Sequence, residues 1–143
     1  TWHGMFLSNG KPTEAVDVMQ FCWKGEWPQS RAPSIRDISL ENIGWRKDHI
    51  IGPSTQVTLK IEYLKYNNNK VLVKYVLYPE AFSNKIGGDI QKSPEPIKFE
   101  IVSQGDNEIT FISPKKKGAY RLFAYVENEK GQSSVANIPF LVE

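Results

Sequence analysis

Apolar and polar residues alternate one by one through the last third of the chain. The alternation runs from residue 120 to 126 and resumes from 136 to 142, and the segment between them holds Asn128 and Gly131. Period-2 alternation interrupted by Asn and Gly is typical of two strands joined by a tight turn. The pattern therefore predicts a half-buried β-hairpin that closes the chain.

The same pattern recurs upstream. It is cleanest over residues 57 to 63, and weaker strand signals lie at 35 to 40, with a bend, and at 71 to 78, 97 to 101 and 109 to 111. The run from 71 to 78 is apolar at most positions, which predicts a strand covered on both faces. Turns are expected at 67 to 69 and 105 to 107, and a long loop at 80 to 96. About seven strands in roughly 108 residues predict a mostly β protein, an immunoglobulin-like β-sandwich with one N-terminal helix. The expected core includes Leu59, Ile61, Phe99, Leu122, Ala124 and Ile138.

The helix is predicted near residues 13 to 24. Thr13 suits the N-cap, Glu14 favours the first turn, and Gly25 with Pro28 ends the helix. Its apolar residues cover well over half of the circumference, more than one sandwich face needs. They are Ala15, Val16, Val18, Met19, Cys22 and Trp23. We expect the surplus side to meet a second body, to mediate self-association, or to remain an exposed apolar patch.

Residues 29 to 34 are predicted to form a short polar linker, so a domain boundary falls between residues 1–34 and 35–143. The absence of Met at Thr1 suggests a fragment of a longer protein. No membrane span is predicted, and no signal peptide is visible.

Charge and cysteine content narrow the function classes. The formal net charge is only +2, and the basic run Lys115–Lys117 lacks accompanying aromatic or arginine residues, which argues against nucleic-acid binding. Cys22 is the only cysteine, so an internal disulfide is excluded, and its apolar surroundings predict a buried, inert thiol.

Candidate chemistry is sparse. His3 and His49 are the only histidines, too few for a usual metal site, and His49 is predicted to be an exposed loop residue. The segment Gly87-Gly88-Asp89 lacks the strand and helix that flank a phosphate site. The carboxylates Glu80, Asp89 and Glu95 are expected to be solvated loop charges. No catalytic residue, metal ligand or cofactor is therefore predicted.

Aromatic residues offer one alternative. Trp27 and Trp45 lie in loop-like contexts and Tyr78 lies near a strand end, where an exposed ring is suited to stacking on a sugar. These three are the candidate carbohydrate-binding residues, and packing in a core or between domains is the competing interpretation. Trp23, on the apolar side of the helix, is expected to be packed.

Residues 2–20, the segment Trp23-Lys-Gly-Glu-Trp-Pro28 and Arg31-Ala-Pro-Ser-Ile35 resemble the end of the catalytic barrel of family 2-type glycoside hydrolases from gut Bacteroidetes. Tyr75-Val-Leu-Tyr-Pro-Glu80, Gly87-Gly-Asp89 and residues 118–123 with 136–140 resemble the immunoglobulin-like domain that follows such a barrel. The resemblance implies that residues 1–34 are the last barrel strand, loop and helix, with Trp2 at the mouth of that strand. It also implies a periplasmic or extracellular location and a TIM-barrel partner domain in the same polypeptide, where catalysis would reside.

Two functions follow as expectations. The first is a non-catalytic accessory domain that braces and positions the barrel of a glycoside hydrolase. The second is a carbohydrate-binding module with its own aromatic surface. A shared solvent-facing patch of Trp27, Trp45 and Tyr78 would favour binding, and burial of these rings would favour bracing.

Overall fold

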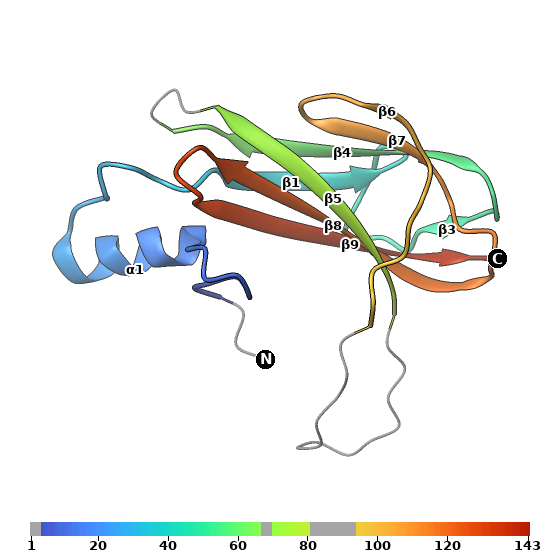
Figure 1. Cartoon of the computed structure of the whole chain (residues 1–143), viewed down its shortest axis with the longest axis horizontal. Coiled ribbons are helices and arrows are strands. Elements are labelled where there is room, and N and C mark those ends of the chain that lie inside the picture. Colours follow the sequence, from blue (N-terminus) through green and yellow to red (C-terminus); the bar gives the residue numbers. More distant parts are fainter. Residues whose placement is uncertain (1–3, 67–69, 81–93) are drawn as a thin grey trace, which may run out of the picture.

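The computed structural model describes residues 4–66, 70–80 and 94–143. The predicted turn at 67–69, most of the predicted loop at 80–96 and the candidates Trp2, His3 and Asp89 lie outside the described residues. Within the described part, one helix stands at one end of a β-sandwich and the chain's C-terminus lies at the other end (Figure 1). The predicted fold class is confirmed.

Helix α1 spans Glu14–Lys24, and Gly25 ends it in the left-handed conformation with φ 72°. The Gly25 N–H donates to the Phe21 carbonyl at 2.8 Å, which satisfies one of the open carbonyls of the last turn. Thr13 stands at the N-cap, as predicted, but its side chain makes no hydrogen bond to the first turn. Its hydroxyl bonds instead to the Gly4 and Met5 carbonyls, so it ties the N-terminal arm (residues 4–12) to the start of the helix.

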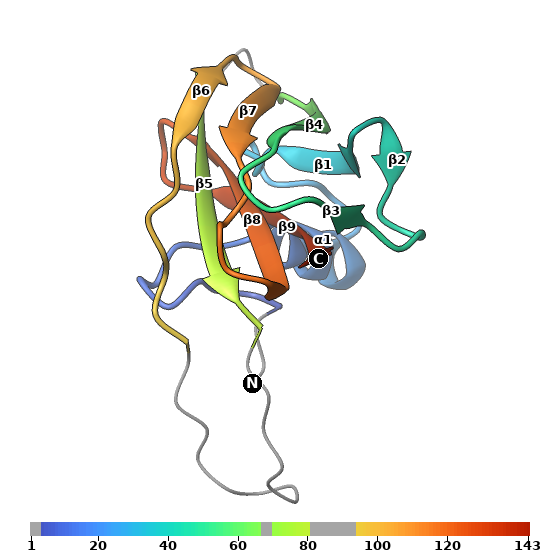
Figure 2. The ribbon, with the colours of Figure 1, turned by 90° about the vertical axis from the view of Figure 1, so that its right-hand side faces the viewer.

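The strands of the described residues form two facing sheets, seen edge-on in Figure 2. The five-stranded sheet has the order β2 (Ile43–Gly44), β1 (Ser34–Leu40), β4 (Gln56–Leu64), β7 (Glu108–Ile112) and β6 (Ile101–Gln104). The four-stranded sheet has the order β3 (Ile50–Ile51), β9 (Ser133–Val142), β8 (Gly118–Asn128) and β5 (Val71–Pro79). All pairs are antiparallel except β3 with β9, which is parallel.

This strand order is that of an immunoglobulin constant-type sandwich. The run β1-β4-β7-β6 corresponds to strands A, B, E and D, and β5-β8-β9 corresponds to C, F and G. Between Leu40 and Ile50 the chain passes from the first sheet to the second. There β3 pairs in parallel with the edge of β9. The sequence could not predict this change of sheet, because strands of two residues show no periodic pattern.

Tyr120 supplies a second mark of this fold. It lies near the start of β8, is 5% exposed, and donates its hydroxyl to the Lys116 carbonyl at 2.7 Å. A tyrosine at this corner whose hydroxyl returns to the upstream backbone is a recurrent feature of such sandwiches. Two residues later, fully buried Leu122 stands where antibody domains carry a disulfide cysteine.

Most of the predicted core is confirmed. Leu59, Ile61 and Leu122 are at most 1% exposed, as are Ala124 and Ile138. Phe99 is only partly buried, and it packs edge-on against Phe111 with ring centroids 5.5 Å apart.

Two strand predictions need correction. The expected strand at 97–101 begins only at Ile101. Ile97 makes a single bridge to Leu77, and the Glu100 carbonyl accepts one hydrogen bond from the Ile112 N–H at 2.9 Å, but residues 98–100 do not form a strand. Strand β5 is not covered on both faces, since Leu72 on its outer face is 63% exposed. The bend expected in the first strand is present as an irregularity between Ile35 and Asp37.

Candidate functional site

Helix α1 contacts the sandwich through its polar side. Asp17 is the one fully buried residue of the helix, and its carboxylate accepts the Ala32 N–H at 2.6 Å. Burial raises the pKa of the Asp17 carboxyl, while the Ala32 hydrogen bond and the charge of Arg31 act in the opposite direction. The carboxylate of Asp17 is therefore the most deeply buried contact of this helix, and the apolar residues Ala15, Val16 and Met19 are only half-buried.

The apolar side of α1 faces away from this anchor. At 100° per residue, Val18, Cys22 and Trp23 lie on the half of the helix that is turned away from Asp17. Trp23 is 75% exposed, Val18 is 41% exposed, and Cys22 is exposed as well. The predictions of a packed Trp23 and a buried Cys22 are wrong, because this part of the apolar surface is not covered by any described residue. We call Val18, Cys22 and Trp23 the outer face of α1.

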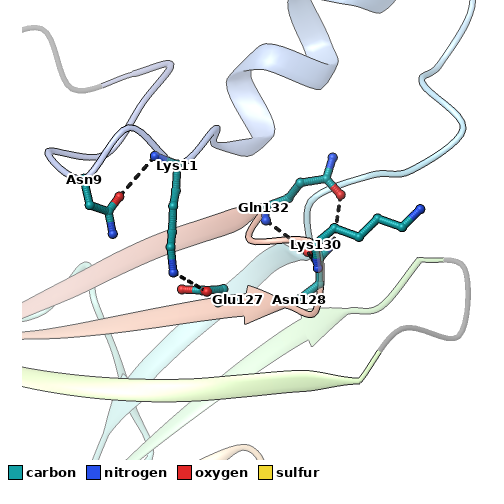
Figure 3. A network of polar contacts seen from close by, with 6 residues as sticks. All are labelled: Asn9, Lys11, Glu127, Asn128, Lys130 and Gln132. Atoms are coloured by element: carbon teal, nitrogen blue, oxygen red, sulfur yellow. Dashed lines mark hydrogen bonds and ion pairs between the residues drawn. The ribbon is translucent and has the colours of Figure 1, made fainter.

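The N-terminal arm holds the helix to the β8–β9 hairpin. Lys11 forms an ion pair with Glu127 of β8 (Figure 3). Ser133 of β9 donates its N–H to the Pro12 carbonyl at 2.9 Å, and Thr13 forms a parallel bridge with Ser133. The arm thus continues the edge of the second sheet up to the first turn of α1.

The segment predicted to be a polar linker is bonded to the same hairpin. Ala32, Pro33 and Ser34 are buried, and Ser134 donates its hydroxyl to the Pro33 carbonyl. Ser30 and Gln132 exchange two hydrogen bonds, at 2.7 and 2.9 Å. The division into residues 1–34 and 35–143 stays a prediction, but these contacts attach the first part closely to the second.

Asn128 organises the hairpin turn and the segment beside it. Its side-chain oxygen accepts the Lys130 and Gln132 N–H groups, each at 3.0 Å (Figure 3). Its amide nitrogen donates to the Arg31 carbonyl at 3.0 Å and to the Gln132 side chain at 2.9 Å. One buried side chain therefore satisfies both the turn and the chain that leads from the helix into β1.

Trp27 is part of a stack at the end of the helix. Its ring lies 4.5 Å from that of Phe21 at an interplanar angle of 15°, and the Arg31 guanidinium lies 3.7 Å from its centroid. Two groups this close cannot share one face of an indole, so both faces are occupied. Arg31 also lies 3.8 Å from the centroid of Tyr66, which closes the stack against the sandwich. Trp27 thus offers no free face to a sugar.

Tyr78 lies half-buried on the outer face of β5. Its ring meets that of Phe123 edge-on at 5.5 Å, and Phe123 stacks on Tyr125 at 6.2 Å. The structure therefore does not gather Trp27, Trp45 and Tyr78 into one patch, because Trp27 belongs to the helix stack and Tyr78 to this row on the second sheet.

Trp45 alone stands beside a cavity. It is 51% exposed, and it lies in the connection between β2 and β3. This connection, residues 45 to 50, forms one wall of an open groove of about 480 Å³. The opposite wall comes from Glu80 and from residues at the start of β8 and the end of β9. These are Ala119, Tyr120, Pro139, Phe140 and Leu141. We call this cavity the Trp45 groove.

Two residues of the groove differ from their sequence-based predictions. His49 is 6% exposed, not an exposed loop residue, because its backbone carbonyl accepts the Leu141 N–H at 2.8 Å and draws it against β9. Burial lowers the pKa of His49, so its imidazole is neutral at pH 7. Glu80 is not a freely solvated charge, since its carboxylate is paired with Arg121 of β8. No sequence signal indicated this pair, which depends on the register of β5 against β8.

Among residues 4–66, 70–80 and 94–143, no group of three or more His, Cys, Asp or Glu side chains is placed to hold a metal ion. In the same ranges, no helix has both the length and the apolar character needed to cross a bilayer.

The strand order and the Tyr120 corner define the chain as an immunoglobulin-like β-sandwich domain. No protein-family model matches it, and neither does any curated protein. Among solved structures, it is similar to PcoC, a methionine-rich copper resistance protein from Escherichia coli, at 13% identity and a TM-score of 0.44, covering 78% of this chain and 99% of PcoC. It is also similar to murine CRIg, at 6% identity and a TM-score of 0.41, covering 78% of this chain and 96% of CRIg. At such values these likenesses carry no information about function.

Proposed function

We propose that this chain is a non-catalytic accessory domain of a glycoside hydrolase, and that it braces and positions a catalytic TIM barrel of the same polypeptide. The observation that carries the proposal is the orientation of α1. Its polar side is anchored on the sandwich through Asp17, while Val18 and Trp23 point into solvent. An exposed apolar surface held on a fixed base is what a domain–domain contact requires.

The helix is attached to the sandwich at several separate points. Lys11 and Glu127, Asp17 and Ala32, and the Phe21–Trp27–Arg31–Tyr66 stack join the helix to the sandwich at its start, middle and end. A body that covers the outer face of α1 would therefore be held in one orientation relative to the sandwich.

The nature of the partner comes from the sequence resemblance. Residues 2–35 resemble the last strand, loop and helix of a glycosidase barrel, and the last helix of a barrel packs its apolar face on the barrel's strands. In this proposal, α1 completes the barrel with its outer face and contacts the sandwich with its Asp17 side. The periplasmic or extracellular location belongs to the same proposal and rests on the same resemblance.

The test uses the whole gene product. We expect Val18→Asp in the full polypeptide to lower the melting temperature of the catalytic domain and its glycosidase activity, because a charge enters the domain contact. Val102→Asp is the matched control, since Val102 is also an exposed valine but lies on β6, at the edge of the five-stranded sheet. Equal effects of the two substitutions, or a gene that encodes no barrel, would overturn the proposal.

A further inference from the structure

The Trp45 groove lies at the end of the sandwich that is opposite to α1. It is built around β3 and the last residues of β9, and Figure 1 places these elements next to the C-terminus, far from the helix. The groove therefore stays open when the outer face of α1 is covered. A function of the groove does not depend on the bracing function.

The loop that carries Trp45 is fixed at both ends. Lys47 donates its N–H to the Gly44 carbonyl at 3.2 Å, and His49 is buried. The His49 carbonyl accepts from Leu141, and Ile50 then pairs with β9. Trp45 is thus half exposed but presented by a rigid turn, which lowers the entropic cost of binding a ligand against it.

Glu80 is held on the opposite wall. Its N–H donates to the Ala119 carbonyl at 2.9 Å, and both Arg121 hydrogen bonds end on Oε1, the Nε bond at 2.7 Å. Arg121 is held in turn by Asn137, with Nη1 2.6 Å from Oδ1. The second carboxylate oxygen, Oε2, makes no hydrogen bond to any described residue and retains its capacity to accept hydroxyl groups.

The groove carries little net charge. Arg46 and Lys47 on the loop have Asp48 beside them, and Glu80 is paired with Arg121. Such a groove has no strong field for an anion or a cation. Its features are one indole ring, a preorganised carboxylate and a volume within the range of about 300–1,000 Å³ that is typical of small-ligand pockets.

We propose that the Trp45 groove binds a neutral sugar unit of a polysaccharide. The apolar C–H face of the sugar ring packs on Trp45 and is removed from water there. Hydroxyl groups of the bound sugar chain, on this unit or the next, donate to Oε2 of Glu80 across the groove. Trp45 supplies the contact area and Glu80 the orientation, which is the usual division of roles in a small-molecule site.

The probes are three neutral polysaccharides, xyloglucan, galactomannan and arabinoxylan, each cast separately into native gels. We expect at least one of them to retard the protein. Trp45→Ala should abolish the retardation, and Glu80→Gln should weaken binding several-fold. Trp23→Ala is the matched control, because Trp23 is the more exposed tryptophan but lies on α1, and it should be retarded like the wild type.

A spectrum of ¹⁵N-labelled protein identifies the contact directly, since its tryptophan indole N–H signals can be assigned by substitution. Titration with an oligosaccharide of the retarding polysaccharide should shift the Trp45 signal and leave the Trp27 signal in place. The spectra also show whether each variant is folded. The proposal is overturned if none of the three gels retards the protein, if folded Trp45→Ala is still retarded, or if only an anionic polymer such as polygalacturonate binds.

Discussion

The sandwich buries its large apolar side chains, whereas the helix leaves several of its own exposed. In the sandwich, Leu59 and Leu122 point between the sheets and are fully buried. In α1, the carboxylate of Asp17 is buried and Trp23 faces solvent. The apolar outer face of α1 is largely exposed in this chain, so we expect it to contribute little to stability. The comparison shows that the same residue types specify folding in one region and are available for contact with another body in the other.

The largest expected effect tests this contrast in the isolated chain. Leu122→Ala removes a fully buried side chain and should lower the free energy of unfolding by about 2–5 kcal/mol. Trp23→Ala removes a larger but exposed side chain and should change it by less than about 0.5 kcal/mol. Urea unfolding of both variants checks the pair. A loss of stability for Trp23→Ala as large as that for Leu122→Ala would refute the contrast.

The next effect concerns the junction between the two regions. Asn128→Ala should lower the free energy of unfolding by about 1–3 kcal/mol, because it leaves the half-buried Arg31 carbonyl and two N–H groups of the turn without their partner. Asn9→Ala, which removes one exposed hydrogen bond to the Lys11 N–H, should have almost no effect. Thermal or urea unfolding measures both, and equal losses would show that Asn128 does not organise the junction.

Two tyrosines allow a comparison within the sandwich alone. The Tyr75 hydroxyl is buried without a hydrogen-bond partner among the described residues, so Tyr75→Phe should leave stability unchanged or raise it by about 1 kcal/mol. Tyr120→Phe breaks the bond to the Lys116 carbonyl and should lower stability by about 1 kcal/mol. Urea unfolding should show that Tyr75→Phe is more stable than Tyr120→Phe. The opposite order would contradict the hydrogen bonding described for these two hydroxyl groups.

The pH dependence of stability sharpens the account of the anchor. Burial raises the pKa of Asp17 above its ordinary value of 3.8, so the folded chain binds this proton more tightly than the unfolded chain. Protonated Asp17 therefore adds to the free energy of unfolding. This stabilisation is fully present below pH 3.8 and is lost as the pH rises through the raised pKa. Asp17→Asn should remove this slope, which cannot exceed about 1.4 kcal/mol per pH unit. Unfolding of both proteins between pH 3.5 and 6.5 measures it, and parallel curves would contradict the prediction.

The regular part of the fold was predictable from the sequence because alternation reports which face of a strand is buried. Strands β4, β8 and β9 follow their apolar patterns, and so does the core residue Leu122. The orientation of α1 could not be predicted in this way. The apolar pattern of a helix shows which side favours burial, but not whether the covering surface belongs to the same domain. Here the most buried residue of the helix is Asp17.

The candidate site was predictable only in part. Trp45 was singled out because an aromatic residue in a loop-like context suits ligand contact, and the structure places it on a groove. Glu80, Arg121 and the burial of His49 depend on the pairing of β5 with β8 and of β3 with β9. These pairings join residues far apart in the sequence, so local patterns cannot predict them.

The central claim, that the outer face of α1 is a contact surface for a neighbouring domain, is tested most directly through Cys22. This thiol lies on the outer face, is exposed in the described structure, and is the only cysteine of the chain. Its rate of alkylation can be measured by mass spectrometry of the Cys22 peptide, in the isolated chain at low concentration and in the whole gene product. The account predicts rapid reaction in the isolated chain and at least about tenfold slower reaction in the intact polypeptide, restored by Val18→Asp. Equal rates in the two would contradict it.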